Sequence, residues 1–478
     1  MSSGNLPLKG ITVVALEQAV AAPFATRQLA DLGARVIKVE RPQVGDFARS
    51  YDGTVKGMAS HFVWLNRSKE SLTLDLKEDK SKEALDRLAA RADVFIQNLA
   101  PGAAGRLGFG AEDLREKYPR LVYCSVSGYG ATGPYKDKKA YDLLVQCEAG
   151  LVSITGTPET PSKVGISAAD IAAGMYAYSG ILAALLRREK TGEGATLDVS
   201  MLEALGEWMG FPAYFAGYGG EEPKRSGASH AAIAPYGPFE CGDGEIVFLG
   251  IQNEREWEKF CEQVLESPEL ADDVRFASNS ERVANREALH EEIESVFARL
   301  SENEAIERLE EASIANARLR TVQQFLDHPQ LKARDCWREV ESPAGPLWAL
   351  LPPATPAGVE PVMAPIPGVG EHTEEILVAL DLEEPPESLD EVRKSIDMVD
   401  HKIVRLLAER EGYVRKAARF KKPQREVEAK ERVEEVIGKV RALAEGHEAS
   451  PEVVEEVYRA MISRFTSLEM DEYAQDLG

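Results

Sequence analysis

The 478-residue sequence has little cysteine and histidine, and it has a deficit of positive charge. Its five cysteines form no CxxC pair and its seven histidines show no ligand spacing such as HxxxH, so neither a disulfide framework nor a metal site is predicted. The formal net charge of −24 argues against binding to nucleic acid or to an anionic membrane. Scattered thiols and the lack of a recognisable signal peptide favour a cytoplasmic protein.

A long hydrophobic run is also lacking. The most extended uncharged stretch, residues 171–186, contains Gly and Ser and is shorter than the roughly 20 residues that a helix needs to cross a bilayer. No membrane-spanning segment is therefore predicted. A chain of this length can instead form two to four domains with cores of their own.

The N-terminal part alternates between strand-like and helix-like segments. Strand-like runs lie at residues 11–16, 35–40, 93–98 and 121–127. This alternation predicts an α/β fold, in which helices cover both faces of a parallel sheet. Ligands of such sheets bind beyond the carboxyl ends of the strands. The residues just past these ends are Glu17, Gln18, Arg41, Asn98 and Gly128.

A glycine motif at residues 128–133 satisfies the GxGxxG pattern after a strand. Pro134 and a charged KDKK run follow it, where a dinucleotide site would need the N-terminus of a helix for the pyrophosphate. The sequence therefore argues against NAD binding.

One carboxylate, Asp170, stands at the start of the uncharged stretch. Apolar residues at helical spacing follow it and predict a helix that buries one face, formed by Ile171, Met175, Tyr178, Leu182 and Leu185. An aspartate at a helix start is commonly a solvated N-cap, so this residue alone does not indicate a site.

The neighbouring sequence does indicate one. Residues 167–201, SAADIAAGMYAYSGILAALLRREKTGEGATLDVSM, resemble the segment around the nucleophilic aspartate of the class III CoA-transferases, the CaiB/BaiF family. Further blocks resemble the family in its own order from about Leu8 to Leu380, among them GITVVALEQAVAAPFATRQLADLGARVIKVERP, WLNRSKESLTLDL, LVYCSVSGYGATGPY and LDHPQLKARDCW. The resemblance implies a Rossmann-like parallel-sheet lobe, a smaller α+β lobe and an interlocked homodimer.

The resemblance also implies roles for individual residues. Asp170 is the expected nucleophile. The expected CoA contacts are Gln18, Val20, Ala21, Arg41, Lys69, Asn98, Leu99, Arg106, Lys139, Tyr141 and Asp142. At the substrate end, glycines are candidates for a mobile cover and cations for binding a second carboxylate, namely Gly219, Gly220 and Gly227, and Arg225, His230 or Arg318.

The implied reaction moves CoA from an acyl-CoA to a small carboxylic acid through intermediates on Asp170, with no permanently bound cofactor. Succinyl-CoA or another small dicarboxylyl-CoA is the expected donor. A carboxylate with the ordinary pKa of about 3.9 is ionised at neutral pH and needs no general base. The alternative is a 2-methylacyl-CoA racemase, but those enzymes place a His-Asp pair where this chain has Tyr141 and Asp142.

The C-terminal part changes character after residues 361–386, which are rich in proline, glycine and acids. From Leu389 on, apolar residues recur four and three apart and predict a helix with a narrow buried seam, made by Val392, Ile396, Val399, Ile403 and Leu406. Two more helices are predicted at about 425–444 and 450–474.

The segment LDEVRKSIDMVDHKIVRLLAERE resembles the first helix of the AroQ-type chorismate mutases, all-helical dimers that convert chorismate to prephenate. Their site residues map onto Arg393, Arg410, Lys421, Lys430, Glu431 and Glu469. Phe465 departs from the family, which commonly has a small polar residue there. This domain is therefore interpreted either as a mutase that binds chorismate or prephenate, or as a dimerisation or sensor module without catalysis.

The predicted organisation follows from the two resemblances. Residues 1–223 form the large CoA-transferase domain, 224–324 the small domain, and 325–380 a return to the large one. A linker at 381–387 precedes the chorismate-mutase-like helical domain at 388–478. The expected partners are acyl-CoA, small carboxylates and another copy of the chain.

Overall fold

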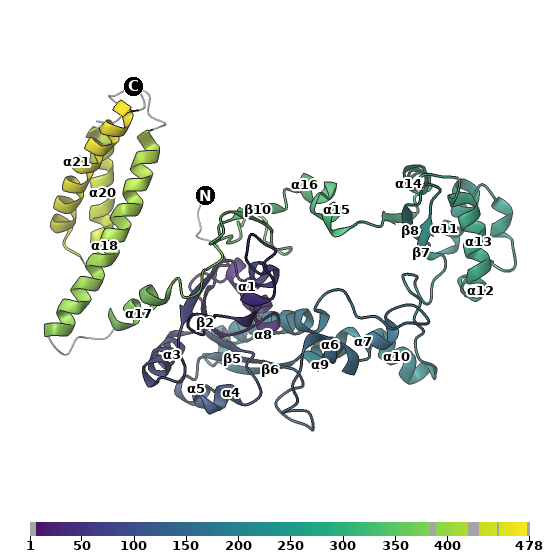
Figure 1. Ribbon diagram of the computed structural model, residues 1–478, viewed down its shortest axis with the longest axis horizontal. Helices are drawn as coiled ribbons and strands as arrows, with labels where there is room; N and C mark the ends of the chain where they lie inside the picture. Colours follow the sequence, from purple (N-terminus) through teal and green to yellow (C-terminus); the bar gives the residue numbers. More distant parts are fainter. Residues whose placement is uncertain (1–5, 383–388, 419–429, 447–448, 476–478) are drawn as a thin grey trace. The chain divides into compact units, whose positions relative to one another are not determined.

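The computed structural model describes residues 6–382, 389–418, 430–446 and 449–475 (Figure 1). The chain divides into two compact units, Met1–Leu377 and Val378–Gly478. The predicted linker at 381–387 lies outside the described residues from position 383 on.

A parallel sheet forms the centre of the first unit. Its order is β3-β2-β1-β4-β5-β6, and every neighbouring pair is parallel. The strands are β1 (Thr12–Leu16), β2 (Arg35–Glu40), β3 (Lys69–Thr73), β4 (Val94–Gln97), β5 (Val122–Ser127) and β6 (Ala195–Ser200). The predicted α/β fold is confirmed, and the edge strands β3 and β6 are the two that the strand-like runs missed.

Helices cover both faces of the sheet. In Figure 1, α4 and α5 lie below the sheet and α1 lies above it. The helices of this part are α1 (Ala21–Asp31), α2 (Ser60–Leu65), α3 (Asp79–Arg91), α4 (Ala103–Arg106), α5 (Ala111–Lys117), α6 (Asp142–Glu148), α7 (Leu151–Ile154), α8 (Ala168–Thr191), α9 (Met201–Trp208) and α10 (Gly210–Gly219).

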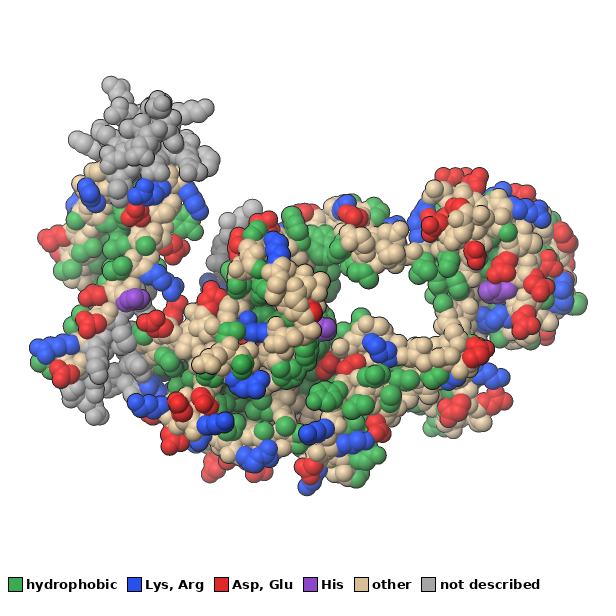
Figure 2. All heavy atoms as spheres, in the orientation of Figure 1, with side chains coloured by type: hydrophobic (Ala, Val, Ile, Leu, Met, Phe, Trp, Pro, Cys, Tyr) green, Lys and Arg blue, Asp and Glu red, His purple; other side chains and the backbone are tan. Residues whose placement is uncertain are grey.

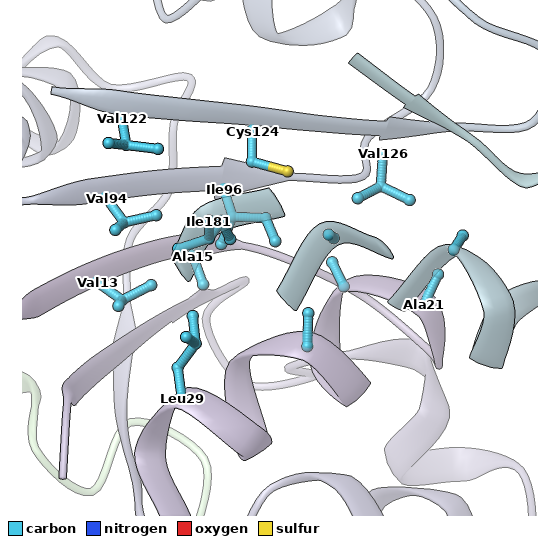
Figure 3. Packing of buried hydrophobic residues seen from close by; sticks show 14 of the residues in the cluster. Val13, Ala15, Ala21, Leu29, Val94, Ile96, Val122, Cys124, Val126 and Ile181 are labelled. Carbon is cyan, nitrogen blue, oxygen red and sulfur yellow. The ribbon is translucent and has the colours of Figure 1, made fainter. Parts of the chain in front are cut away.

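The main core lies between the sheet and helices α1 and α8. Alternate residues of the strands point into it, because successive side chains of a strand face opposite sides. Figure 3 shows Val13, Val94 and Val122 on three neighbouring strands, with Leu29 and Ile181 among the side chains that meet them. All five side chains are fully buried.

Helix α8 buries a different face from the one predicted. Of the five apolar residues named for the buried face, only Leu185 is buried, whereas Met175 is 38% exposed. The buried face consists mainly of small residues, which are Ala168, Ala169, Ala172, Ala173, Gly174, Ala177 and Ala184, and it also includes Ile181. Small side chains let the backbone of α8 pack closely against α1. The buried face of α8 is therefore the one with the small residues, and not the one with the large apolar residues that the spacing predicted.

The length and apolar composition of α8 also match those of a membrane-crossing helix, although 44% of its apolar window is buried inside the protein. The small residues that pack against α1 and the sheet account for this composition. Helix α8 is thus a core helix of the first unit.

A second lobe of the first unit has its own core. An antiparallel sheet of order β7-β8-β9 packs with helices around Phe239, Trp257, Phe276 and Phe297. Its elements are β7 (Tyr236–Glu240), β8 (Ile246–Gly250), β9 (Ala315–Arg318), α11 (Glu254–Lys259), α12 (Asn279–Ala284), α13 (Arg286–Phe297) and α14 (Glu302–Glu311).

After this lobe the chain runs through α15 (Val322–Leu326), α16 (Pro329–Ala333), the hairpin β10 (Trp337–Val340) and β11 (Leu347–Leu350), and α17 (Thr373–Leu382). It then lies beside strand β3. The Ser68 N–H donates to the carbonyls of Ala364 and Pro365, and the Thr73 N–H donates to Thr373 Oγ1 at 2.9 Å.

The C-terminal unit is helical. It contains α18 (Leu389–Ala418), α20 (Lys430–Gly446) and α21 (Pro451–Gln475). The predicted buried seam of α18 is wrong for a single chain, since Ile396, Ile403 and Leu406 are 54%, 47% and 59% exposed. Helix α21 packs against α18 at another face, where the Arg410 guanidinium lies 5.0 Å from the centre of the Phe465 ring.

Candidate functional site

Asp170 is the third residue of α8, so it is not the N-cap that its position in the sequence suggested. Ser167 occupies the cap position and makes no capping bond with its side chain. The cap is supplied instead by Asp142, the first residue of α6, whose Oδ1 accepts from the backbone N–H of Ala169 at 2.8 Å and of Asp170 at 3.3 Å. Gln146 donates to the other oxygen of Asp142 at 2.7 Å.

The environment of Asp170 changes its protonation. Burial of the carboxyl group, with a smaller contribution from the negative charge of Asp142, raises its pKa to about 7. The expectation of an ordinary carboxylate that is fully ionised at neutral pH is therefore wrong. A partly buried carboxyl group whose pKa lies near 7 is typical of a reactive group.

The turn between β1 and α1 carries the next cluster of predicted residues. Asn98, which follows β4, accepts from the Gln18 N–H with Oδ1 and donates to the Gln18 carbonyl with Nδ2, both at 2.8 Å. Ala19 has a left-handed backbone with φ of 60°. Val20 is the N-cap of α1 and Ala21 is its first residue, and both are buried. The carboxyl ends of β1 and β4 thus place Gln18, Val20, Ala21 and Asn98 together.

A close helix contact brings this turn to the nucleophile. Gly174 lies one turn after Asp170 on α8, and a Cβ built on it would lie only 2.7 Å from the Ala21 carbonyl oxygen. Only glycine allows this approach, which puts the start of α1 against the first turns of α8. The predicted CoA-contacting turn therefore lies at the start of a helix, α1, that packs directly against α8, the helix of the predicted nucleophile.

Lys69 lies in the interior of the protein and not on its surface. Its Nζ donates to Glu17 Oε1 at 2.7 Å, to the Pro23 carbonyl at 3.1 Å and to Asn66 Oδ1 at 3.1 Å. All three donor positions of the ammonium are thus used inside the protein. The structure offers no free donor on Lys69 for the predicted CoA contact.

Lys69 belongs to a buried ion network. Lys38 Nζ lies 3.3 Å from Glu17 Oε1 and 2.8 Å from Asp46 Oδ2, and the side chains of Glu17, Lys38 and Lys69 are fully inaccessible. Burial alone would raise the pKa of Glu17, but the two lysines together hold it below its usual value. The sequence offered one signal for this network, since a lysine in the middle of the apolar strand RVIKVE needs a buried partner.

The remaining predicted cations are solvent-accessible. Arg41 and Lys139 are exposed in loops. Arg106 is exposed at the end of α4 and donates to the Pro101 carbonyl at 3.3 Å. Tyr141 is 69% exposed, and Leu99 is partly buried beside β4. Exposed cations of this kind could bind phosphates.

At the expected substrate end, two predicted cations are engaged in the protein's own structure. Arg225 donates to the carbonyls of Ser153, Thr157 and Pro158 at 2.8 to 3.0 Å, and Arg318 pairs with Glu302. His230 is exposed and stacks on the Tyr236 ring. The candidate cover glycines, Gly219, Gly220 and Gly227, are exposed, and Gly220 and Gly227 have positive φ.

Tyr51, which the sequence did not reveal, interacts electrostatically with Asp170. Burial raises the pKa of its hydroxyl to about 12, with further contributions from the charges of Asp46, Asp170 and Tyr141. Its ring packs edge-on against His61 at 5.5 Å. Tyr51 is 49% exposed, and its phenol is protonated at neutral pH.

The mutase-like residues can be placed only in part. Arg393 is exposed on α18, and Arg410 is partly buried with Nη1 buried and unbonded. Lys421 lies outside the described residues. Lys430 and Glu431 begin α20 and Glu469 lies on α21, but the structure does not describe these three side chains. Within the described residues, no group of three or more His, Cys, Asp or Glu side chains could hold a metal ion.

Comparison with known proteins identifies the same two families that the sequence resembles. Residues 8–373 match CoA-transferase family III, and residues 392–470 match chorismate mutase type II. The human succinyl-CoA:glutarate CoA-transferase is 34% identical over 376 residues, which cover 78% of this chain and 85% of that protein. The succinyl-CoA:mesaconate CoA-transferase of Haloarcula hispanica is 36% identical over 346 residues, covering 70% and 86%.

The solved structures agree. The crystal structure of a CaiB/BaiF family protein from Brucella suis superposes with a TM-score of 0.71 at 33% identity, and the match covers 79% of this chain and all of that one. The chain therefore belongs to CoA-transferase family III and is a class III CoA-transferase (EC 2.8.3.-) that carries a chorismate mutase type II domain at its C-terminus.

Proposed function

We propose that the enzyme moves CoA from succinyl-CoA, or another small dicarboxylyl-CoA, to a small mono- or dicarboxylic acid through intermediates on Asp170. The observation that carries this proposal is the partly buried Asp170 carboxyl, with its raised pKa, on a helix that touches the β1–α1 turn. The dicarboxylate preference is supported by the named substrates of the human and Haloarcula relatives.

The reaction begins when an Asp170 carboxylate oxygen attacks the thioester carbonyl of the donor. The C–S bond breaks, CoA leaves as the thiolate, and an acyl-aspartyl anhydride remains. The thiolate then attacks the aspartyl carbonyl and expels the donor acid as a carboxylate, which leaves an aspartyl-CoA thioester. Splitting one difficult exchange into two easier ones is the advantage of covalent catalysis.

The acceptor repeats these steps in reverse. Its carboxylate attacks the aspartyl-CoA thioester, releases the thiolate and forms a second anhydride. The thiolate attacks the acceptor's acyl carbon, which gives the new acyl-CoA and frees Asp170. No proton is gained or lost overall, so the protein's task is to bind, orient and exclude water.

Each tetrahedral intermediate needs donors for its oxyanion. The backbone N–H groups of Ala169 and Asp170 are not available, because both donate to Asp142. The Tyr51 hydroxyl is a protonated group near Asp170, and the glycines at 219 and 220 lie in an exposed segment. We assign the oxyanion contacts to these groups.

The CoA contacts of the proposal are the β1–α1 turn with its neighbours and a set of exposed cations, although the side chains of Val20 and Ala21 in that turn are buried. The β1–α1 turn with Asn98 and Leu99 would bind near the thioester, and Arg41, Arg106 and Lys139 would bind the phosphates. Lys69 is not part of this set. His230 is retained as a contact for the second carboxylate, since Arg225 and Arg318 already bind groups of the protein.

The decisive experiment is mass spectrometry of CoA esters after the protein is mixed with succinyl-CoA and a set of small acids. Asp170→Ala should abolish new acyl-CoA species. Asp113→Asn is the matched control, since Asp113 is the third residue of α5, as Asp170 is of α8, and it lies exposed away from the site. Transfer that survives in Asp170→Ala would overturn the mechanism.

A homodimer is proposed on a separate observation. Helix α10 and the last residue of α9 expose large aromatic side chains, with Trp208 51%, Phe211 63%, Tyr214 69% and Tyr218 86% accessible. An apolar surface of this kind marks an interface. Light scattering should give the mass of two chains, and Phe211→Ser with Tyr214→Ser should shift it toward one.

The C-terminal domain is proposed to bind a chorismate-like dicarboxylate or to serve in assembly. Hydrophobic side chains lie among charged ones on the face of this unit that Figure 2 shows, and the seam of α18 is exposed. Chorismate added to the transfer assay separates the roles: consumption indicates a mutase, and a changed rate of transfer without consumption indicates a sensor. The five unpaired cysteines fit a cytoplasmic enzyme.

A further inference from the structure

Ala19 has an unusual backbone for its residue type. Its φ of 60° is left-handed, a conformation that a residue with a Cβ rarely adopts. Among the described residues, the other non-glycine residues with positive φ all have polar side chains; they are Gln43, Lys56, Ser68, Glu266, Ser313 and Asp335. Ala19 cannot stabilise this conformation with its own side chain, so other residues must hold it.

Asp46 provides that hold. Its Oδ1 accepts from the Ala19 N–H at 3.1 Å and from the Ala48 N–H at 2.9 Å. Its own N–H donates to Glu40 Oε1 at 2.8 Å, so the residue is tied to the end of β2. Asp46 is 2% exposed, and these bonds link the loop after β2 to the turn after β1.

The charge of Asp46 is matched by Lys38. Lys38 Nζ lies 2.8 Å from Asp46 Oδ2, and its side chain is fully buried between Asp46 and Glu17. Together with Lys69, the group has two buried anions and two buried cations. An asparagine at position 46 would leave an excess of buried positive charge and would turn an amide toward Lys38.

We propose that Asp46 is a positioning residue for CoA binding: its carboxylate holds Ala19 left-handed and thereby sets the backbone of Gln18, Val20 and Ala21. This inference rests on the proposed function, in which that turn contacts CoA. Asp46 touches no substrate in this assignment. It acts through Ala19.

The test is calorimetric titration of the full-length protein with CoA. Asp46→Asn should weaken the affinity roughly tenfold or more, because the Ala19 N–H loses its charged acceptor. The KM for acyl-CoA should rise in the same proportion, whereas kcat at saturating acyl-CoA should change less.

The same strand provides a matched control. Asp93 accepts from the Thr12 N–H at 2.8 Å and pairs with Arg188 at 2.8 Å, so it makes the same two kinds of bond at the opposite end of β1. Asp93→Asn should lower the melting temperature and leave the CoA affinity unchanged. A purely structural role for Asp46 would give the same pattern for Asp46→Asn.

Rescue gives a sharper criterion. Glycine adopts the left-handed conformation freely, so Ala19→Gly added to Asp46→Asn should restore most of the affinity. If Asp46→Asn does not fold, Ala19→Val tests the turn with every buried charge in place, since a β-branched residue opposes positive φ. Native affinity in Asp46→Asn or in Ala19→Val, or a lack of rescue, would overturn the proposal. Failure of the proposed function would appear differently, as wild-type protein that does not bind CoA or as transfer that survives in Asp170→Ala.

Discussion

The carboxylate of Asp142 accepts a hydrogen bond from the backbone N–H of Asp170. The residue that caps α8 is therefore also a charged neighbour of the proposed nucleophile, which is the third residue of that helix. The N-terminus of α8 favours a negative charge. Asp142 already supplies one there, so the charge of Asp170 is opposed by a neighbour as well as by burial. The result is a nucleophile that is roughly half protonated at neutral pH, since its pKa is about 7.

The rate of transfer should therefore depend on pH in a defined direction. Only the carboxylate form of Asp170 attacks the thioester, so kcat/KM for acyl-CoA should rise as the pH increases through about 7. Asp142→Asn removes the neighbouring charge and lowers the pKa of Asp170, which should move this rise to lower pH. A pH–rate profile of the two proteins measures the shift. Asp113→Asn, at the N-terminus of α5, should leave the profile in place; an unshifted profile in Asp142→Asn would exclude the charge effect.

The raised pKa of Asp170 also predicts a cost in stability. The folded-state pKa of about 7 lies above the ordinary value of 3.8, so folding disfavours the carboxylate. This cost is absent below about pH 4, grows as the pH rises and is complete above about pH 7. Asp170→Asn removes it and should raise the melting temperature at pH 8, by roughly 1–2 °C for each kcal/mol in a unit of this size, Met1–Leu377. Thermal scans at pH 4 should show little difference between the proteins; an equal gain at both pH values would contradict the titration argument.

Lys69 should affect stability and not ligand affinity directly. Lys69→Gln leaves Glu17 with one cation fewer in a buried site, and breaking a buried pair costs about 3–5 kcal/mol. A large drop in the melting temperature is the expected result. Lys139→Gln is the matched comparison, since Lys139 is exposed and assigned to a CoA phosphate. It should raise the KM for acyl-CoA without a change in melting temperature. If Lys69→Gln instead keeps the native stability and raises the KM, Lys69 contacts CoA directly and the structural role is wrong.

The sequence predicted those features that depend on local patterns. Strands β1, β2, β4 and β5 are apolar because they are buried on both faces, and their predicted ends differ from the observed ones by at most one residue. Strands β3 and β6, KESLT and ATLDVS, lie at the sheet edges and alternate with polar residues. Such short mixed segments carry too weak a signal to be separated from loops.

Features that depend on distant partners could not be predicted. Glu17, Lys38 and Lys69 lie on or beside three different strands, and only the strand order 3-2-1 brings their charges together. The raised pKa of Asp170 depends on Asp142, which belongs to another helix. The buried face of α8 was misjudged because periodicity alone gives weight to large apolar residues, whereas alanines and Gly174 make the close contact.

Gly174 provides the last prediction. In an exposed part of a helix, Gly→Ala stabilises by up to about 1 kcal/mol because alanine is the better helix former. At Gly174 the added Cβ would lie 2.7 Å from the Ala21 carbonyl oxygen and 3.1 Å from Phe24 Cβ, so α1 and α8 would be forced apart. Gly174→Ala should therefore lower the melting temperature and raise the KM for acyl-CoA, because it displaces the nucleophile from the β1–α1 turn. Gly206→Ala in α9 is the control, since no atom lies within 4 Å of its built Cβ, and it should be neutral or stabilising. If both substitutions stabilise equally, the contact between α1 and α8 is looser than the structure shows, and the argument that this contact sets the site geometry fails.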